Sequence, residues 1–135
     1  MTDAAKKKIL IVDDEISVGK SIRQALLREN FQIELALSGE EALNKEVQTA
    51  FDVIIVDLMM PGLSGLDLLK ALKAKASRAQ VIMVTGYPTM KNTLQAMQMG
   101  AFDFLPKPFL PSDIRSLVDR ALAAANNNGE ASSDR

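Results

Sequence analysis

A short apolar run that ends in a carboxylate constrains the fold of this chain more than any other feature of its sequence. Residues 53–56 are valine and isoleucine only, a composition typical of a strand buried on both faces of a sheet. Asp57 follows directly, and Pro61 and Gly62 lie a few residues later. Because proline lacks a backbone donor and glycine permits a turn, the chain must leave the sheet there. The sequence therefore predicts that a rigid strand holds Asp57 at the rim of a sheet.

A second strand of the same kind also ends in acidic residues. Residues 9–12 are again all apolar, and Asp13, Asp14 and Glu15 follow them. Taken alone, Asp57 is better explained as a solvated carboxylate that caps the next helix than as a nucleophile or metal ligand. Two buried strands that both end in carboxylates change this balance, because such strands can deliver their acids to one place.

Strand and helix patterns alternate along the whole chain. Strands are predicted at 7–12, 31–37, 53–57, 81–84 and 101–105, and helices at 16–29, after Ser38, after Ser64, at 90–99 and at 110–125. In the second helix, Leu43 and Val47 are expected to face the core. This alternation predicts one α/β domain with a parallel sheet, helices on both faces and right-handed connections. In that architecture ligands bind at the carboxyl ends of the strands.

The last residues of the chain lack any periodic pattern. Residues 126–135 are mainly polar or small, and we expect them to form a disordered tail or the start of a linker. The folded domain is accordingly predicted to cover residues 1–125.

Composition excludes several classes of site. The chain of 135 residues has no cysteine and no histidine, which excludes disulfides, thiolate metal sites and histidine-based catalysis. The formal charge is −1 with basic residues spread along the chain, which argues against nucleic-acid binding by this domain. No stretch resembles a signal-peptide core or a membrane span, so the expected location is the cytoplasm.

Chemically useful side chains follow four of the five predicted strands. They are Asp13 and Asp14, Asp57, Thr85, and Lys107. Three carboxylates in one place repel one another unless cations lie among them. Lys107 supplies only one positive charge, so a divalent ion is implied. Oxygen-only ligands that leave room for water favour Mg²⁺ over Ca²⁺.

A carboxylate beside Mg²⁺ and a lysine is a workable site for phosphoryl transfer, which needs positioning and charge neutralisation above all. In this hypothesis Asp57 attacks phosphorus while Asp13 and Asp14 hold the metal. Lys107 pairs with a phosphoryl oxygen, and Thr85 donates a hydrogen bond to another. For each residue alone, a structural role is the better explanation. Separate structural roles do not explain why all of these residues lie at one edge of the sheet.

Four ordered blocks carry a resemblance to a known family. They are Ile-Val-Asp-Asp-Glu at 11–15, Val-Asp-Leu-Met-Met-Pro-Gly at 56–62, Val-Thr-Gly at 84–86 and Phe-Leu-Pro-Lys-Pro-Phe at 104–109. Together they resemble the signature blocks of two-component response regulator receiver domains, over about residues 7–125. The resemblance implies a doubly wound, flavodoxin-like sheet of five parallel strands in the order 2-1-3-4-5 with five helices, as in chemotaxis regulators. The stretch 85–109 also resembles receivers of nitrogen-regulation-type transcriptional activators.

The same resemblance implies a role for each residue of the acidic site. Asp57 matches the phosphoacceptor, and Asp13 and Asp14 match the family's acidic pair. Met59 matches the position that offers a backbone carbonyl to Mg²⁺. The phosphodonor would be a histidine kinase or a histidine phosphotransfer protein of a phosphorelay, which fits the absence of histidine here.

Further positions match the part of the family that transmits the signal. Thr85 and Phe104 correspond to its coupled hydroxyl and aromatic switch, and Lys107 precedes a proline, Pro108, that is typically cis. Phosphorylation is expected to change the surface of the fourth helix, fifth strand and fifth helix, which the family uses for dimerisation or partner docking. If the chain is a fragment, a C-terminal output domain that regulates transcription is implied.

The family also tunes the loss of its phosphoryl group at two positions, here Met59 and Tyr87. Neither side chain is an acid or an amide that would orient a water molecule. We therefore expect a long-lived phosphorylated state.

Three other functions share features with this sequence. A haloacid dehalogenase-type phosphatase also uses an aspartate nucleophile but needs a second acid two residues later, where Met59 lies, so no turnover enzyme is expected. A flavodoxin-like cofactor binder needs a phosphate loop after the first strand, where Asp13, Asp14 and Glu15 would repel the phosphate. The surviving alternative is an interaction module that keeps the receiver fold and signals without phosphorylation.

Overall fold

Five parallel strands form a single sheet, as the alternation of strands and helices predicted, and their order, β2-β1-β3-β4-β5, is the one that the resemblance to receiver domains implied. In the computed structural model the chain is described over residues 6–133. The strands are β1 (Lys7–Val12), β2 (Phe31–Ala36), β3 (Val53–Asp57), β4 (Gln80–Thr85) and β5 (Asp103–Pro106). The helices are α1 (Ile16–Ala25), α2 (Gly39–Gln48), α3 (Gly65–Ala74), α4 (Met90–Gln98) and α5 (Pro111–Ser133). This is the flavodoxin-like, doubly wound arrangement of the expected fold class.

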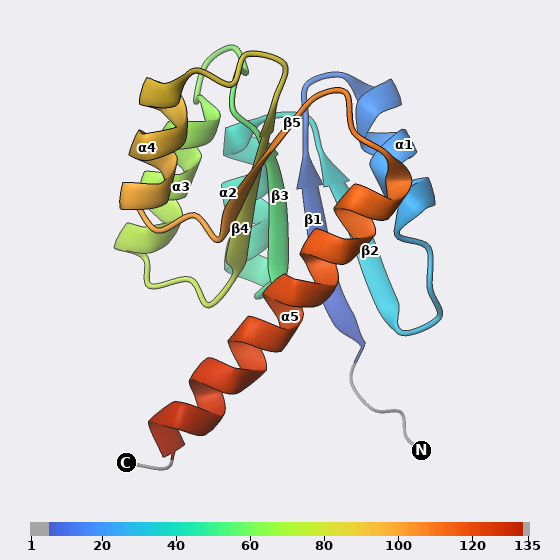
Figure 1. Ribbon diagram of the computed structural model, residues 1–135, viewed down its shortest axis with the longest axis vertical. Coiled ribbons are helices and arrows are strands. Elements are labelled where there is room, and N and C mark those ends of the chain that lie inside the picture. Colours follow the sequence, from blue (N-terminus) through green and yellow to red (C-terminus); the bar gives the residue numbers. More distant parts are fainter. Residues whose placement is uncertain (1–5, 134–135) are drawn as a thin grey trace.

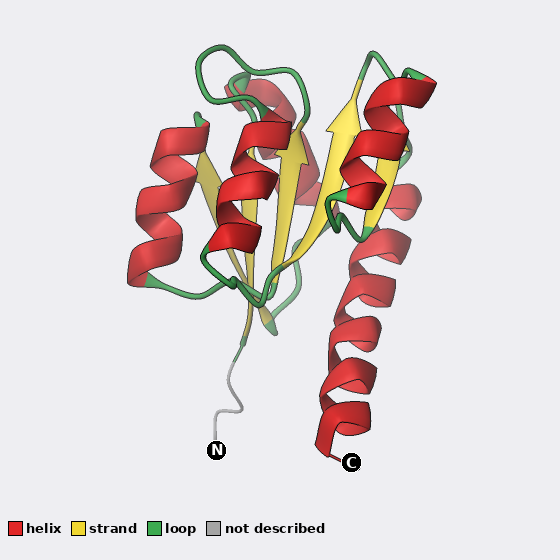
Figure 2. Ribbon diagram, turned by 90° about the vertical axis from the view of Figure 1, so that its left-hand side faces the viewer, coloured by secondary structure: helices red, strands yellow, loops and turns green. Residues whose placement is uncertain are grey.

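The helices cover both faces of the sheet and divide the core into two clusters (Figures 1 and 2). One cluster joins side chains of α2, α3 and α4 to one face, and the other joins those of α1 and α5 to the opposite face. In β3, Ile54 and Val56 belong to the first cluster, whereas Val53 and Ile55 belong to the second. Successive strand residues point to opposite faces, so a continuous apolar run is what a central strand requires.

The expectation for Val47 is wrong. Ser38 does cap α2, since its Oγ accepts the backbone N–H of Glu41 at 3.1 Å. Gly39 and Ala42 are the buried residues of this helix, with Leu43 packed at the edge of the core, while Val47 is 72% exposed. At 3.6 residues per turn, Val47 lies about 140° around the helix axis from Ala42, which places it on the solvent side.

The last helix continues past the end expected from the sequence. The sequence predicted that it ends at Ala125, but α5 runs to Ser133, and Figure 1 shows it extending well beyond the sheet. Adding a residue to an existing helix is much easier than starting one, and no proline follows Ala125. Residues 134 and 135 lie outside the described part of the chain, and the domain boundary at residue 125 stays a prediction.

Within residues 6–133, no helix combines the length and apolar character that crossing a bilayer requires.

The core assignment leads to a stability prediction with a matched control. Leu69 of α3 is fully buried, so Leu69→Ala should lower the free energy of unfolding by about 2–5 kcal/mol. Val47→Ala removes apolar atoms from an exposed helix position and should change the free energy of unfolding by no more than about 0.5 kcal/mol. Urea unfolding of both variants measures the difference, and similar losses in the two would contradict the assignment of the helix faces.

Candidate functional site

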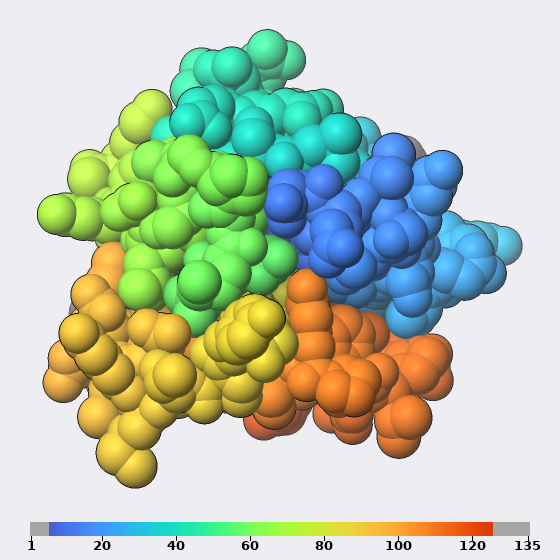
Figure 3. All heavy atoms as spheres, turned by 90° about the horizontal axis from the view of Figure 1, so that it is seen from above, coloured from blue at the N-terminus to red at the C-terminus, as the bar shows by residue number. Residues whose placement is uncertain are grey.

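Four connecting segments meet at the carboxyl edge of the sheet. Figure 3 looks down on this edge, where the segments after β1, β3, β4 and β5 surround a common centre. A cavity of about 290 Å³ lies there, lined by Asp14, Glu15, Asp57, Met59, Thr85, Gly86, Tyr87 and Lys107. Parallel strands place their carboxyl ends on the same edge, so residues far apart in the sequence become neighbours.

A single ammonium group joins the two buried carboxylates of the site. The Nζ atom of Lys107 lies 3.3 Å from Oδ2 of Asp13 and 3.5 Å from Oδ2 of Asp57. Asp13 is 2% exposed and Asp57 6%. The backbone N–H of Lys107 donates to the carbonyl of Thr85 at 2.7 Å, which anchors the lysine to the end of β4. The structure thus brings together the residues that the sequence assigned to this rim.

The second oxygen of each buried carboxylate accepts a hydrogen bond from a backbone N–H two residues later. Oδ1 of Asp13 accepts the N–H of Glu15 at 2.9 Å, and Oδ1 of Asp57 accepts the N–H of Met59 at 3.1 Å. These bonds orient both carboxylates, so that their Oδ2 atoms face Lys107.

The acidic residues form a donor set that suits a hard divalent cation. Carboxylate oxygens of Asp13, Asp14 and Asp57 lie within 4.8 Å of one another, and Asp14 is exposed to solvent. Three carboxylates against one contacting lysine leave an excess of negative charge. Mg²⁺ prefers a few carboxylates completed by water, and these residues fit that preference.

Burial raises the pKa of Asp57. The loss of hydration is the largest cause, and the nearby charge of Asp13 acts in the same direction. The hydrogen bond from Met59 and the charge of Lys107 oppose the rise but do not cancel it. Burial alone would lower the pKa of Lys107, but attraction to Asp57 and Asp13 raises it overall. Asp57 is therefore a more basic carboxylate than a solvated one, beside a lysine that stays charged.

Thr85 and Phe104 lie on the same side of the sheet. In the pairing of β4 with β5, Thr85 stands opposite Pro106 and Met83 stands opposite Phe104, and residues two apart share a face. Thr85 is fully buried, and its Oγ1 accepts the N–H of Tyr87 at 3.0 Å. Phe104 is only partly buried and packs against the α2–α4 side of the core.

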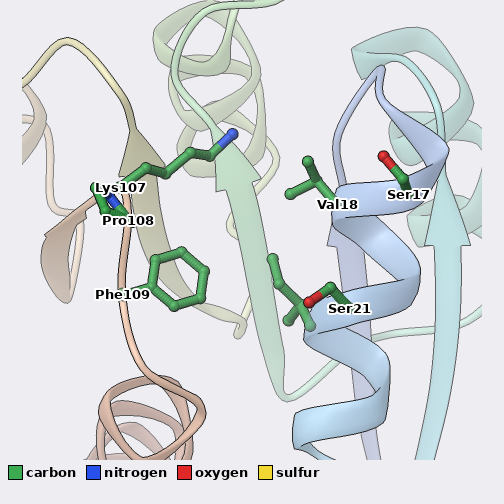
Figure 4. Close-up of a pocket in the computed structure, with 7 residues that line it drawn as sticks. Ser17, Val18, Ser21, Lys107, Pro108 and Phe109 are labelled. Atoms are coloured by element: carbon green, nitrogen blue, oxygen red, sulfur yellow. The ribbon is translucent and has the colours of Figure 1, made fainter.

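A second hollow adjoins the acidic site and was not identified from the sequence. It has a volume of about 510 Å³ and lies between one side of α1 and the segment from β5 to α5, lined by Ser17, Val18, Ser21, Ile22, Lys107, Pro108 and Phe109. Figure 4 shows Phe109 facing α1, while Lys107 reaches away toward the end of β3. The Lys107–Pro108 peptide bond is cis. The spacing of Ser17 and Ser21 marks one side of a helix, but nothing local indicates which loop faces it.

The raised pKa of Asp57 predicts how stability depends on pH. The folded state holds this proton more tightly than the unfolded chain, so the resulting stabilisation is complete below the ordinary pKa of 3.8. It is lost as the pH rises through the raised value. Asp57→Asn should therefore be more stable than the wild type at neutral pH, and the gap should narrow as the pH falls toward about 4. Urea unfolding at several pH values with a chelator present measures this; a gap that does not depend on pH would contradict it.

Comparison with known proteins identifies the family of the chain. Residues 9–119 match the model of the response regulator receiver domain. The chain is 34% identical to the transcriptional regulatory protein ResD of Bacillus subtilis, over 93% of this chain and 52% of ResD. It is 37% identical to the DNA-binding transcriptional regulator NtrC of Klebsiella pneumoniae, over 84% of this chain and 24% of NtrC. The chain thus spans about half, or less, of the length of these relatives.

Solved structures of response regulators have the same fold as this chain. A CheY-like receiver domain protein from Methanospirillum hungatei superposes with a TM-score of 0.87 at 29% identity, covering 92% of this chain and 99% of that one. NtrX from Brucella abortus superposes with a TM-score of 0.89 at 28% identity, over 96% of this chain and 30% of NtrX. Because the family model matches residues 9–119 of the 135, this chain belongs to the response regulator receiver domains of two-component signalling systems.

Proposed function

We propose that this domain accepts a phosphoryl group on Asp57 from a histidine kinase or a histidine phosphotransfer protein. The observation that carries the proposal is the pairing of one lysine with two buried carboxylates at the mouth of a cavity. Oδ2 of Asp57 attacks phosphorus, the P–N bond of the partner's phosphohistidine breaks, and a P–O bond forms in an acyl phosphate. The chain has no histidine, so the donor must come from a partner or a small phosphoanhydride.

Each residue around Asp57 has a definite task in this reaction. Asp13, Asp14, Asp57 and the backbone carbonyl of Met59 would hold Mg²⁺, which when bound neutralises charge on the transferring group. Lys107 already contacts the acceptor carboxylate and pairs with a phosphoryl oxygen once that group arrives. Asp57 is oriented by the N–H of Met59, so the nucleophile needs little rearrangement before attack.

The signal passes from Asp57 to Thr85. The hydroxyl oxygen of Thr85 accepts the N–H of Tyr87, which leaves its own proton free to donate to a phosphoryl oxygen. Movement of Thr85 toward that group opens space on the face that it shares with Phe104. A complete shift between two conformations needs about 5.5 kcal/mol of differential stabilisation, and a new dianion with several acceptor oxygens is a suitable source.

The receiving surface comprises α4, β5 and α5. Met90, Leu94 and Met97 of α4 are all exposed, and they form an apolar face suited to a second copy or to another domain. The relatives named above are transcriptional regulators, so we propose that an output of that kind reads this surface. A module that signals without phosphorylation remains the alternative, and the next experiment separates the two.

Incubation with acetyl phosphate tests the proposed function. The wild type should gain one phosphoryl group by intact mass, only with Mg²⁺ present, because the reaction needs both the nucleophile and charge neutralisation. Asp57→Ala should gain none, whereas Asp119→Ala, an exposed carboxylate on α5, should behave as the wild type. Addition that survives Asp57→Ala would mean that the nucleophile is another residue. No addition, either from acetyl phosphate or from phosphorylated histidine kinases, would favour the phosphorylation-independent module.

The lifetime of the phosphorylated state gives a second prediction. Met59 and Tyr87 line the cavity beside Asp57 and are both more than half exposed, but neither orients water for attack on the acyl phosphate. Met59→Asn introduces an amide that can do so and should shorten the phosphoryl half-life severalfold, followed by intact mass after removal of the donor. Val47→Asn, at an exposed apolar position on α2 that lies outside the surface of α4, β5 and α5, serves as the control. Equal half-lives in the wild type and Met59→Asn would refute this account.

A further inference from the structure

The first residue of α3, Gly65, lies against the backbone of the proposed phosphoacceptor. A Cβ atom at this position would lie 2.5 Å from the carbonyl oxygen of Asp57 and 2.7 Å from Cα of Leu58. It would also lie 3.0 Å from the terminal methyl of Met83. The two shortest contacts are to main-chain atoms at the end of β3 and directly after it. These atoms cannot move away by a change of rotamer, as the end of a side chain can.

Glycine is required here because of proximity, and its conformational freedom plays no part. Gly62 and Gly100 have positive φ angles, but Gly65 does not. Alanine would be accepted by the local backbone and is the better helix former. The contact with Asp57 and Leu58 is therefore what excludes a side chain.

The backbone of Leu58, the residue that follows Asp57, is also held by hydrogen bonds on both sides. The N–H of Leu58 donates to the carbonyl of Val84 at 2.8 Å, and the carbonyl of Leu58 accepts the N–H of Gly65 at 3.0 Å. The segment that leaves β3 is thus held between β4 on one side and the start of α3 on the other. Asp57 and the N–H of Met59 that orients its Oδ1 flank this residue.

The start of α3 is itself fixed by a capping box. Oγ of Ser64 accepts the N–H of Asp67 at 3.2 Å, and Oδ2 of Asp67 accepts the N–H of Ser64 at 3.4 Å. Reciprocal bonds of this kind fix where a helix begins. The capping box therefore fixes Gly65, and Gly65 lies in van der Waals range of the Asp57 backbone.

We propose that Gly65 is a positioning residue for phosphoryl transfer, acting through the close packing of α3 against the Asp57–Leu58 backbone. The proposal rests on the proposed function of Asp57. A side chain at position 65 displaces the end of β3 and moves the Asp57 carboxylate relative to Lys107, Asp13 and the arriving phosphorus. A displacement of about 1 Å can reduce the rate of an enzymatic reaction about 100-fold, although Gly65 touches none of the reacting atoms.

The test compares Gly65→Ala with Gly39→Ala. Gly39 begins α2, and a Cβ there would lie 2.8 Å from Cδ2 of Leu63. This contact is also crowded, though slightly less so, and it reaches the side chain of Leu63 in the loop between β3 and α3, not the Asp57 backbone. Rates of phosphorylation by acetyl phosphate with Mg²⁺ are measured over a range of donor concentrations by intact mass. Urea unfolding of each variant shows how much folded stability is lost.

The positioning role predicts a specific pattern. Gly65→Ala should lower the maximal phosphorylation rate at least tenfold and change the half-saturating donor concentration little, at a temperature where the protein is folded. Gly39→Ala should keep a rate within about twofold of the wild type. Equal rates in Gly65→Ala and the wild type, or equal losses in the two glycine variants, would overturn the proposal. A wild type that is not phosphorylated at all would instead overturn the proposed function.

A milder pair of variants keeps the test decisive if Gly65→Ala does not fold. Ser64→Ala removes the cap of α3 at an exposed site, and Ser38→Ala removes the corresponding cap of α2. Both variants lose one capping bond, but only Ser64 fixes the residue packed against Asp57. Slower phosphorylation in Ser64→Ala than in Ser38→Ala supports the positioning role, and equal rates at equal loss of stability overturn it.

Discussion

The arrangement of this domain depends on one lysine that pairs with two buried carboxylates. Lys107 extends from the end of β5 to Asp13 at the end of β1 and Asp57 at the end of β3. Removal of the lysine from such a buried cluster typically costs about 3–5 kcal/mol, because both carboxylates then lose their compensating charge. The carboxyl edge of the sheet is therefore held together by the same interaction that keeps the proposed nucleophile, Asp57, in place, so folding and the proposed chemistry depend on the same contacts.

Most of the site could be predicted from the sequence because parallel-sheet geometry requires little long-range information. Once apolar strands are recognised, their carboxyl ends must lie on one edge. Asp57, Thr85 and Lys107 could thus be placed together before the strand order was known. The observed order, 2-1-3-4-5, agrees with that implied by the resemblance to receiver domains and brings β1 beside β3.

Features that depend on contacts between elements could not be predicted in the same way. Val47 has an apolar side chain at helical spacing from Leu43 but faces solvent, because the orientation of α2 against the sheet decides which residues are covered. Gly65 looks like an ordinary helix-start glycine until its distance to the Asp57 backbone is known. The end of α5 at Ser133 likewise follows from propagation of a helix that tertiary packing has already started.

The shallow attachment of α4 has an energetic consequence for the whole domain. Among the residues of this helix, all of which the structure describes, only Ala96 is buried, whereas every residue of β3 is buried. The free energy of local opening follows the apolar contacts that opening disrupts. Amide protons of α4 are therefore expected to exchange with solvent through local opening of low free energy, whereas exchange in β3 is expected to require nearly global unfolding. Under the proposed function, a small change in free energy at Asp57 is enough to change the conformations of α4 while the sheet that carries the site stays unchanged.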